Sequence, residues 1–77
     1  MIEALKYHGM FIEIRRVASR TELTCTGIVK VEEFVDDLVT LAAHGGRLKI
    51  SGKALSISVF DGRAVKVFGK ITGVQLL

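Results

Sequence analysis

Apolar and polar residues alternate along much of this 77-residue chain. Strict alternation is typical of β-strands, because successive side chains point to opposite faces of a sheet. In the first alternating segment, Leu23 and Cys25 alternate with Glu22, Thr24 and Thr26. The pattern is clearest over residues 22–26, 46–51, 54–60 and 63–68. It predicts strands with one buried face and one face in water.

Glycines separate these segments, since the chain has eight glycines and no proline. Asp61-Gly62 lies between two alternating segments and predicts a tight hairpin, whose turn positions require positive φ. His44-Gly45-Gly46 predicts a second turn, and Val35-Asp36-Asp37 a third. No Pro-rich or Ser/Gly-rich linker interrupts the chain, which indicates one domain overall.

Three segments allow more than one interpretation. Residues 30–43 have apolar spacings that also suit a helix, but their Val and Thr content favours strand–turn–strand. Residues 1–9 could form a short helical turn or an ordered arm. Residues 46–53 resemble 62–70, as in a β-solenoid, although a simple meander explains the similarity equally well. We therefore expect an all-β antiparallel meander of about seven short strands, forming a roll or sandwich, with a solenoid as the alternative.

The composition points toward self-association. Apolar residues make up 49% of the chain and the mean hydropathy is +0.43, which is high for so small a monomer. Domains of this size have marginal stability unless a disulfide, a metal or another subunit assists them. A single cysteine excludes an intrachain disulfide. We therefore expect that the chain is stabilised by forming a homo-oligomer.

Charge is unevenly distributed along the chain. Residues 1–20, 21–44 and 45–77 carry net charges of +2, −4 and +5. Such segments could dock head to tail on a neighbouring copy. The simpler interpretation, which we favour here, is a solvated surface with unevenly placed charges.

No pattern of residues predicts a metal site or a bound cofactor. Cys25, His8 and His44 are isolated from one another, whereas metal ligands occur at short, characteristic spacings. Cys25 lies on the apolar side of its predicted strand, where we expect it to be buried as a small apolar residue. Residues 46–53 do not form a phosphate-binding loop, because five residues separate the glycines and Ala54 replaces the required hydroxyl.

No pattern predicts catalysis either. Glu32-Glu33 and Asp36-Asp37 are the only adjacent carboxylate pairs, and neighbouring residues on a strand point to opposite faces. No Gly-x-Ser-x-Gly nucleophile elbow occurs. We expect a protein that is not an enzyme and has no catalytic residues.

Basic residues are the candidate partner contacts. Arg47, Lys49 and Lys66 are predicted to share the solvent-facing side of adjacent strands, and Lys70 follows them; together they could follow an anionic chain. Single-strand binders add aromatic residues for base stacking, and only Phe68 fits that role. Nucleic acid is therefore an unlikely partner, and a basic module for nucleic acid or an anionic surface is the alternative function.

Neither a secretion signal nor an apolar run of membrane-spanning length is evident. A lone thiol fits a reducing compartment. The expected location is cytoplasmic.

Six motifs follow one another in the order found in a known family. They are Leu23-Thr24-Cys25-Thr26-Gly27-Ile28, Val31-Glu32-Glu33-Phe34, Val39-Thr40-Leu41, Gly46-Arg47-Leu48-Lys49-Ile50-Ser51-Gly52, Leu55-Ser56-Ile57 and Val65-Lys66-Val67-Phe68-Gly69-Lys70-Ile71. In this succession the chain resembles the YabP/YqfC family of sporulation proteins, over about two-thirds of its length.

The resemblance implies a YabP/YqfC-like β domain over residues 21–77, after an N-terminal arm and first strand over 1–20. It also implies a non-enzymatic protein of spore-forming bacteria that acts where the spore cortex or coat is assembled. The expected partners are further copies of the chain and other sporulation proteins.

Overall fold

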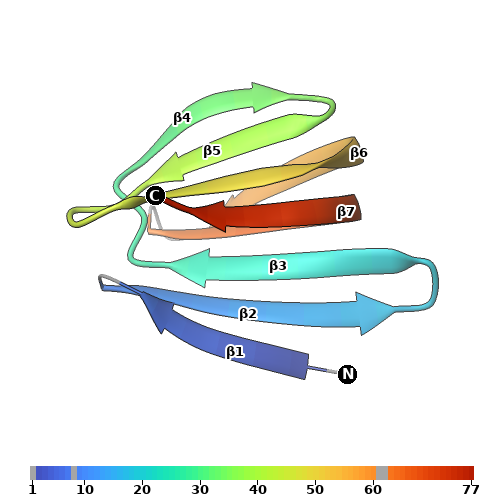
Figure 1. Ribbon diagram of the computed structural model, residues 1–77, viewed down its shortest axis with the longest axis horizontal. Helices are drawn as coiled ribbons and strands as arrows, with labels where there is room; N and C mark the ends of the chain where they lie inside the picture. Colours follow the sequence, from blue (N-terminus) through green and yellow to red (C-terminus); the bar gives the residue numbers. More distant parts are fainter. Residues whose placement is uncertain (1, 8, 61–62) are drawn as a thin grey trace.

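The structure is a computed structural model that describes residues 2–7, 9–60 and 63–77 (Figure 1). The described residues form strands and connecting turns, which confirms the all-β prediction. The seven strands are β1 (Ile2–Tyr7), β2 (Met10–Val17), β3 (Arg20–Thr26), β4 (Lys30–Val35), β5 (Leu38–Ala42), β6 (Arg47–Phe60) and β7 (Ala64–Leu76).

All seven strands belong to one antiparallel sheet in the order β1-β2-β3-β7-β6-β5-β4. After β3 the chain passes to the far end of this order and returns through β5 and β6, so that β7 pairs with β3 (Figure 1). Only residues 27–29 connect β3 to β4, because the sheet curls and brings those strand ends together. Backbone hydrogen bonds hold this closure, from Ile28 N–H to Arg63 O (3.0 Å) and from Val29 N–H to Ala42 O (2.8 Å).

A bend in β6 and β7 produces the curl. The β6–β7 register shifts between Ser51 and Gly52 and again between Lys53 and Ser56. Ala54 adopts a φ of 52° at this point, and Gly69 on the facing strand has a φ of 140°. A Cβ atom on Gly69 would lie 2.7 Å from the carbonyl oxygen of Ala54, so only glycine fits without a shift.

The bend divides the sheet into two layers. One contains β1, β2 and β3 with residues 56–60 and 64–69, and the other contains β4 and β5 with residues 47–52 and 71–76. The predicted strands 46–51 and 54–60 are therefore two halves of the 14-residue β6 rather than separate short strands. The predicted strand 63–68 is the first half of the 13-residue β7.

The core lies between the two layers and takes side chains from both. β3 supplies Leu23 and Cys25, as the alternation predicted, and Ile28 enters from the β3–β4 connection. The buried apolar residues are Met10, Ile12, Leu23, Cys25, Ile28, Val39, Leu41, Leu48, Ile50, Leu55, Val65 and Val67. Because no polar side chain is buried among the described residues, burial of apolar surface is the main stabilising contribution to the fold.

The remaining predictions have clear outcomes. Residues 30–43 form β4, a turn at Asp36-Asp37 and β5, which confirms strand–turn–strand over the helical alternative. A turn around His44-Gly45 joins β5 to β6 as expected, whereas Asp61-Gly62 lies outside the described residues. Residues 2–7 form a strand of the same sheet rather than a helical turn. Of the two similar segments, residues 47–53 lie in β6 and residues 64–70 in β7, so they belong to paired strands of a roll and not to stacked solenoid turns.

Candidate interaction surfaces

The predicted basic residues do not share one surface. Lys49 pairs in register with Thr40 and Gln75 in one layer, whereas Lys66 pairs with Thr24 and Ser58 in the other. Ser58 lies nine residues after Lys49 on β6, beyond the bend. The expected common face is therefore wrong, because the sequence pattern did not reveal that β6 continues through Gly52 and turns.

Two of these basic residues, Arg47 and Lys70, have charged residues as neighbours. Arg47 Nε lies 2.8 Å from Glu32 Oε1, which links β6 to β4 across β5. Such exposed ion pairs contribute about 0.2–1 kcal/mol. Lys70 is the register partner of Lys53 at the bend, so two cationic residues stand opposite each other on β6 and β7 there. Contact of any of these cations with a partner stays a prediction.

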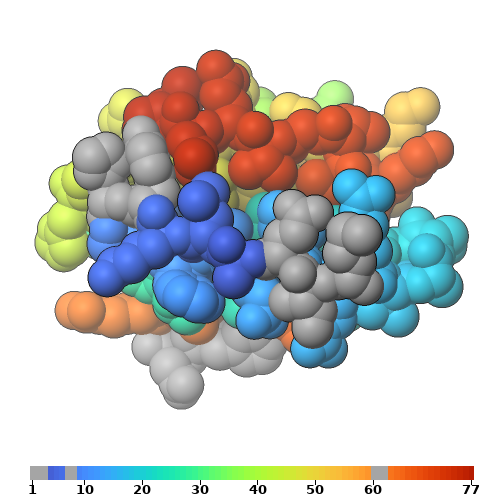
Figure 2. Space-filling model, turned by 60° about the horizontal axis from the view of Figure 1, so that its bottom comes forward, coloured from blue at the N-terminus to red at the C-terminus, as the bar shows by residue number. Residues whose placement is uncertain are grey.

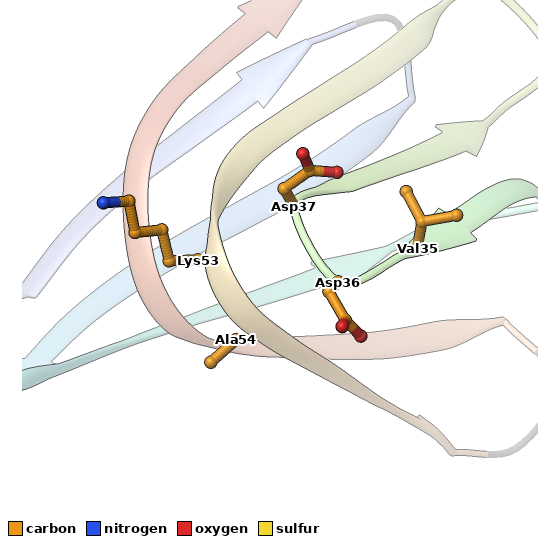
Figure 3. Close-up of a pocket in the computed structure, with 5 residues that line it drawn as sticks. All are labelled: Val35, Asp36, Asp37, Lys53 and Ala54. Atoms are coloured by element: carbon orange, nitrogen blue, oxygen red, sulfur yellow. The ribbon is translucent and has the colours of Figure 1, made fainter.

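The acidic β4–β5 turn covers the bend of β6 and leaves an open hollow of about 570 Å³ (Figure 3). The main-chain carbonyls of Asp37 and Asp36 accept hydrogen bonds from Gly52 N–H (3.1 Å) and Leu55 N–H (2.8 Å). In Figure 3 the two carboxylates point in different directions, and the Lys53 ammonium points away from both. Over the described ranges no three His, Cys, Asp or Glu residues gather as a metal site. The two main-chain hydrogen bonds therefore hold the β4–β5 turn against the bend of β6 and stabilise it.

Cys25 is fully buried on β3, as its position in the alternating pattern predicted. Burial raises the pKa of its thiol to about 11, because the thiolate would lose its hydration in the apolar core. The thiol Sγ lies 3.9 Å from the carbonyl oxygen of Thr26. At neutral pH the thiol stays protonated, and it lacks the exposed, electropositive setting of a reactive cysteine.

An apolar hollow of about 340 Å³ opens where the two layers separate. Leu5 on β1 and Ile12 and Ile14 on β2 form one wall, and Val74 and Leu76 on β7 form the other, with Ala4 also in the lining. Figure 2 displays this side of the molecule, with β1 in dark blue beneath the red second half of β7. Half of the Leu5 surface is exposed. We call this feature the apolar mouth.

The mouth stays open because the two halves of β7 have different neighbours. Over the described pairings β3 reaches only as far as Gly69, so residues 71–76 pair with β6 alone. Val74 and Leu76 stand opposite the buried Ile50 and Leu48, and thus face inward like them. The sequence analysis made no prediction for these residues, because the alternating segments that it identified end at residue 68.

At the other end of the strand order, β4 carries a different exposed surface. Phe34 and Val35 are each nearly half exposed there. Glu33 precedes Phe34, and the exposed Asp36-Asp37 turn follows Val35. A bulge between Val31 and Glu33 interrupts the β4–β5 ladder. Bulges and charged residues on an edge strand disfavour pairing with another main chain.

The fold and these surfaces define a small all-β roll whose candidate sites are exposed apolar and charged surfaces. The family model of the YabP family matches residues 15–77, from the middle of β2 to the end of the chain. The chain belongs to the YabP family, and this membership points to a sporulation-related protein. A search of curated proteins finds no match. Across the described residues, no helix is long and apolar enough to span a membrane.

Proposed function

We propose that the chain is a non-enzymatic structural protein of spore development, which assembles with copies of itself or with other proteins during formation of the cortex or coat. Family membership supports the setting. One observation carries the assembly role: nine large apolar side chains expose between 40% and 56% of their surface. They are Leu5, Phe11, Val17, Val29, Phe34, Val35, Val59, Val74 and Leu77.

Exposed apolar surface of this extent favours association over an isolated chain. Transferring one such side chain fully out of water stabilises a contact by about 1.5–3 kcal/mol, and half-exposed residues retain a part of that gain. The folded core is small, with twelve buried apolar residues among those described. Association would therefore add appreciable stability to a chain that has no disulfide.

Sedimentation velocity and light scattering over a range of concentrations test this proposal. We expect species larger than the monomer that grow with concentration. A chain that stays strictly monomeric up to high micromolar concentration would contradict self-association. In a spore-forming host, a deletion strain with normal cortex and coat in thin sections would contradict the developmental role.

One observation favours a second candidate, a binding module for an anionic surface or nucleic acid. The guanidinium of Arg20 lies 5.0 Å from the ring centroid of Phe68, and Lys66 lies two residues away on β7. A cation stacked on a ring is a combination that binds phosphates and bases together. Binding to single-stranded nucleic acid or anionic vesicles that does not weaken with added salt would argue against this alternative.

A further inference from the structure

The two edges of the sheet differ in how well they are protected against pairing with another strand. An edge strand presents unpaired main-chain N–H and C=O groups, and bulges and charged residues protect such an edge. β4 has both, with a bulge between Val31 and Glu33 and three charged residues among its six. β1 has no bulge, because all of Ile2–Tyr7 pairs with β2 in an uninterrupted register. Among the described residues, no strand lies on the far side of β1 (Figure 1).

The β1–β2 hairpin determines which main-chain groups of β1 remain unpaired. Tyr7 is the register partner of Met10, and two residues separate them. In such a hairpin the last pair exchanges main-chain hydrogen bonds, and hydrogen-bonded pairs then alternate along the strands. The main-chain groups of Leu5 therefore bond to β2, whereas those of Ala4 and Lys6 point to the free edge. β1 thus offers a regular row of donors and acceptors to a further strand.

The features of both edges favour β1 of a second copy as that strand. Two identical strands that pair antiparallel about a twofold axis use the same edge, so both free β1 edges are covered at once. Pairing of β1 with β4 of a neighbour is hindered by the bulge and the charges of β4. Glu3 and Lys6 give β1 a net charge of zero, so no excess of one sign repels a second β1.

The residues of β1 select the register of such a pair. A twofold axis normal to the sheet keeps the inward-facing sides of both copies together, so each allowed register is centred on one residue that stands opposite its own copy. Centres at Glu3 or Lys6 bring like charges together, and centres at the strand ends pair few residues. A centre at Ala4 places Leu5 opposite Glu3. A centre at Leu5 places two leucines opposite each other, and each exposes 50% of its surface in the single chain.

We infer that two copies of the chain pair through β1 in an antiparallel, twofold contact centred on Leu5. The sheets of the two copies then continue into each other. Lys6 of each copy stands opposite Ala4 of the other, and these two residues exchange the main-chain hydrogen bonds that the free edge lacks. The small side chain of Ala4 leaves room for the lysine stem. This contact deepens the proposed self-association, on which it rests, by naming the surface that each copy uses.

A proline on the free edge tests the contact. Ala4→Pro removes an N–H group that points away from β2, so pairing with β2 is retained while a bond to the second copy is lost. Because the substitution occurs twice in a twofold pair, dimerisation should weaken at least about 30-fold. Ala4→Ser is the matched control, since it keeps the N–H group, and it should dimerise like the unmodified chain. Sedimentation equilibrium measures both variants, and circular dichroism should show that both are folded.

Single cysteines test the register independently of the proline variant. Opposite Cα atoms in a pair without mutual hydrogen bonds lie about 4.5 Å apart, within the range of a disulfide, so Leu5→Cys should form a disulfide-linked dimer on mild oxidation. Lys6→Cys should link poorly, because the two copies of this residue are diagonal neighbours about 7–8 Å apart. Ser56→Cys, exposed on β6 and distant from β1 in the strand order, controls for random collisions. The natural Cys25 is buried and should not react.

The results distinguish failure of the β1 contact from failure of self-association. A strictly monomeric chain would leave the β1 edge to a strand of another protein and would overturn both. If the chain assembles but Ala4→Pro assembles as well as Ala4→Ser, the β1 contact is overturned while self-association stands. Cross-linking of Leu5→Cys that is no faster than that of Ser56→Cys overturns it as well. Faster cross-linking of Lys6→Cys than of Leu5→Cys would contradict the centre at Leu5.

Discussion

The two halves of β7 carry similar alternating patterns but have different environments. In the first half, between β3 and β6, Val65 and Val67 are 2% and 0% exposed. In the second half Val74 is 40% exposed, although it faces the same interior. The difference lies in the number of neighbouring strands rather than in the residue type. We call residues 64–69 the closed half of β7 and residues 71–76 the open half. The closed half contributes to the buried core, whereas the open half leaves apolar surface exposed to which a partner could bind.

The largest expected effect concerns the bend that ends the closed half. Gly69→Ala places a Cβ 2.7 Å from the Ala54 carbonyl oxygen at a φ of 140°, and we expect it to lower the free energy of unfolding by about 3 kcal/mol. Gly73→Ala, in the open half, meets its nearest atom at 4.0 Å and should change stability by less than about 1 kcal/mol. Urea unfolding of both variants measures this. Equal losses would mean that the bend does not need a glycine.

Truncating the two inward-facing valines compares the halves directly. Val67→Ala removes buried carbon atoms and leaves a cavity, so it should cost about 2–3 kcal/mol of unfolding free energy. Val74→Ala should cost less than about 1 kcal/mol, because a large part of its surface is already in water. Chemical denaturation at a concentration where the chain is monomeric checks the difference. A similar cost at both positions would show that the mouth is closed in solution.

Cys25 is the register partner of Val65 in the closed half of β7. The pH dependence of stability that comes from its thiol therefore tests how well this half is shielded from water. The pKa of the thiol is about 11 in the folded chain and 9.0 as the reference for the unfolded chain. The unfolded state therefore loses this proton first as the pH rises. The stability from the neutral thiol is present below pH 9 and is lost between pH 9 and 11, by about 1.4 kcal/mol at pH 10.

The measurement is the difference between two pH profiles of stability. Cys25→Ala should be less stable than the unmodified chain at pH 8, and the gap should narrow toward pH 11 because the variant has no thiol to ionise. All other ionisable groups are the same in both proteins, so their contributions cancel in the difference. A gap that stays constant over this range would mean that the thiol is accessible to water in the folded chain.

The smallest effect is expected at the other side of the bend. Ala54 has a φ of 52°, where a residue with a Cβ is strained and glycine is not. Ala54→Gly should therefore leave the chain equally stable or stabilise it by up to about 1 kcal/mol. Ala64→Gly, at the regular start of β7, should instead destabilise by about 0.5–1 kcal/mol. Thermal unfolding of the two variants tests whether the bend carries this strain.

Several features of the fold followed from local patterns. The burial of Leu23 and Cys25 and the turns near His44 and Asp36 needed only alternation and turn-forming residues. The ends of β6 and β7 could not be placed in the same way. Gly52 and Gly69 indicated breaks between strands, and the structure uses both in a bend that the strands pass through. A local pattern cannot distinguish a bend from a break, because the distinction depends on which strand lies opposite.

The candidate surfaces were predictable only in part. The basic residues Arg47, Lys49, Lys66 and Lys70 were visible in the sequence, but the bend places them in different layers. Leu5 and Val74 belong to segments far apart in sequence, and nothing in either segment indicates that they line one mouth. The negative charge around Phe34 was evident, whereas its exposure depends on the position of β4 at the end of the sheet.

The amino-acid sequence by itself determined the all-β class, the inward direction of Leu23 and Cys25 and membership of the YabP family. These depend on the two-residue period of strands and on a succession of short motifs, both of which are local properties. Only the tertiary structure decided which inward-facing residues are buried and which line the apolar mouth. That distinction depends on strand order and on the bend at Gly52 and Gly69, because burial requires a neighbouring element that distant parts of the chain supply.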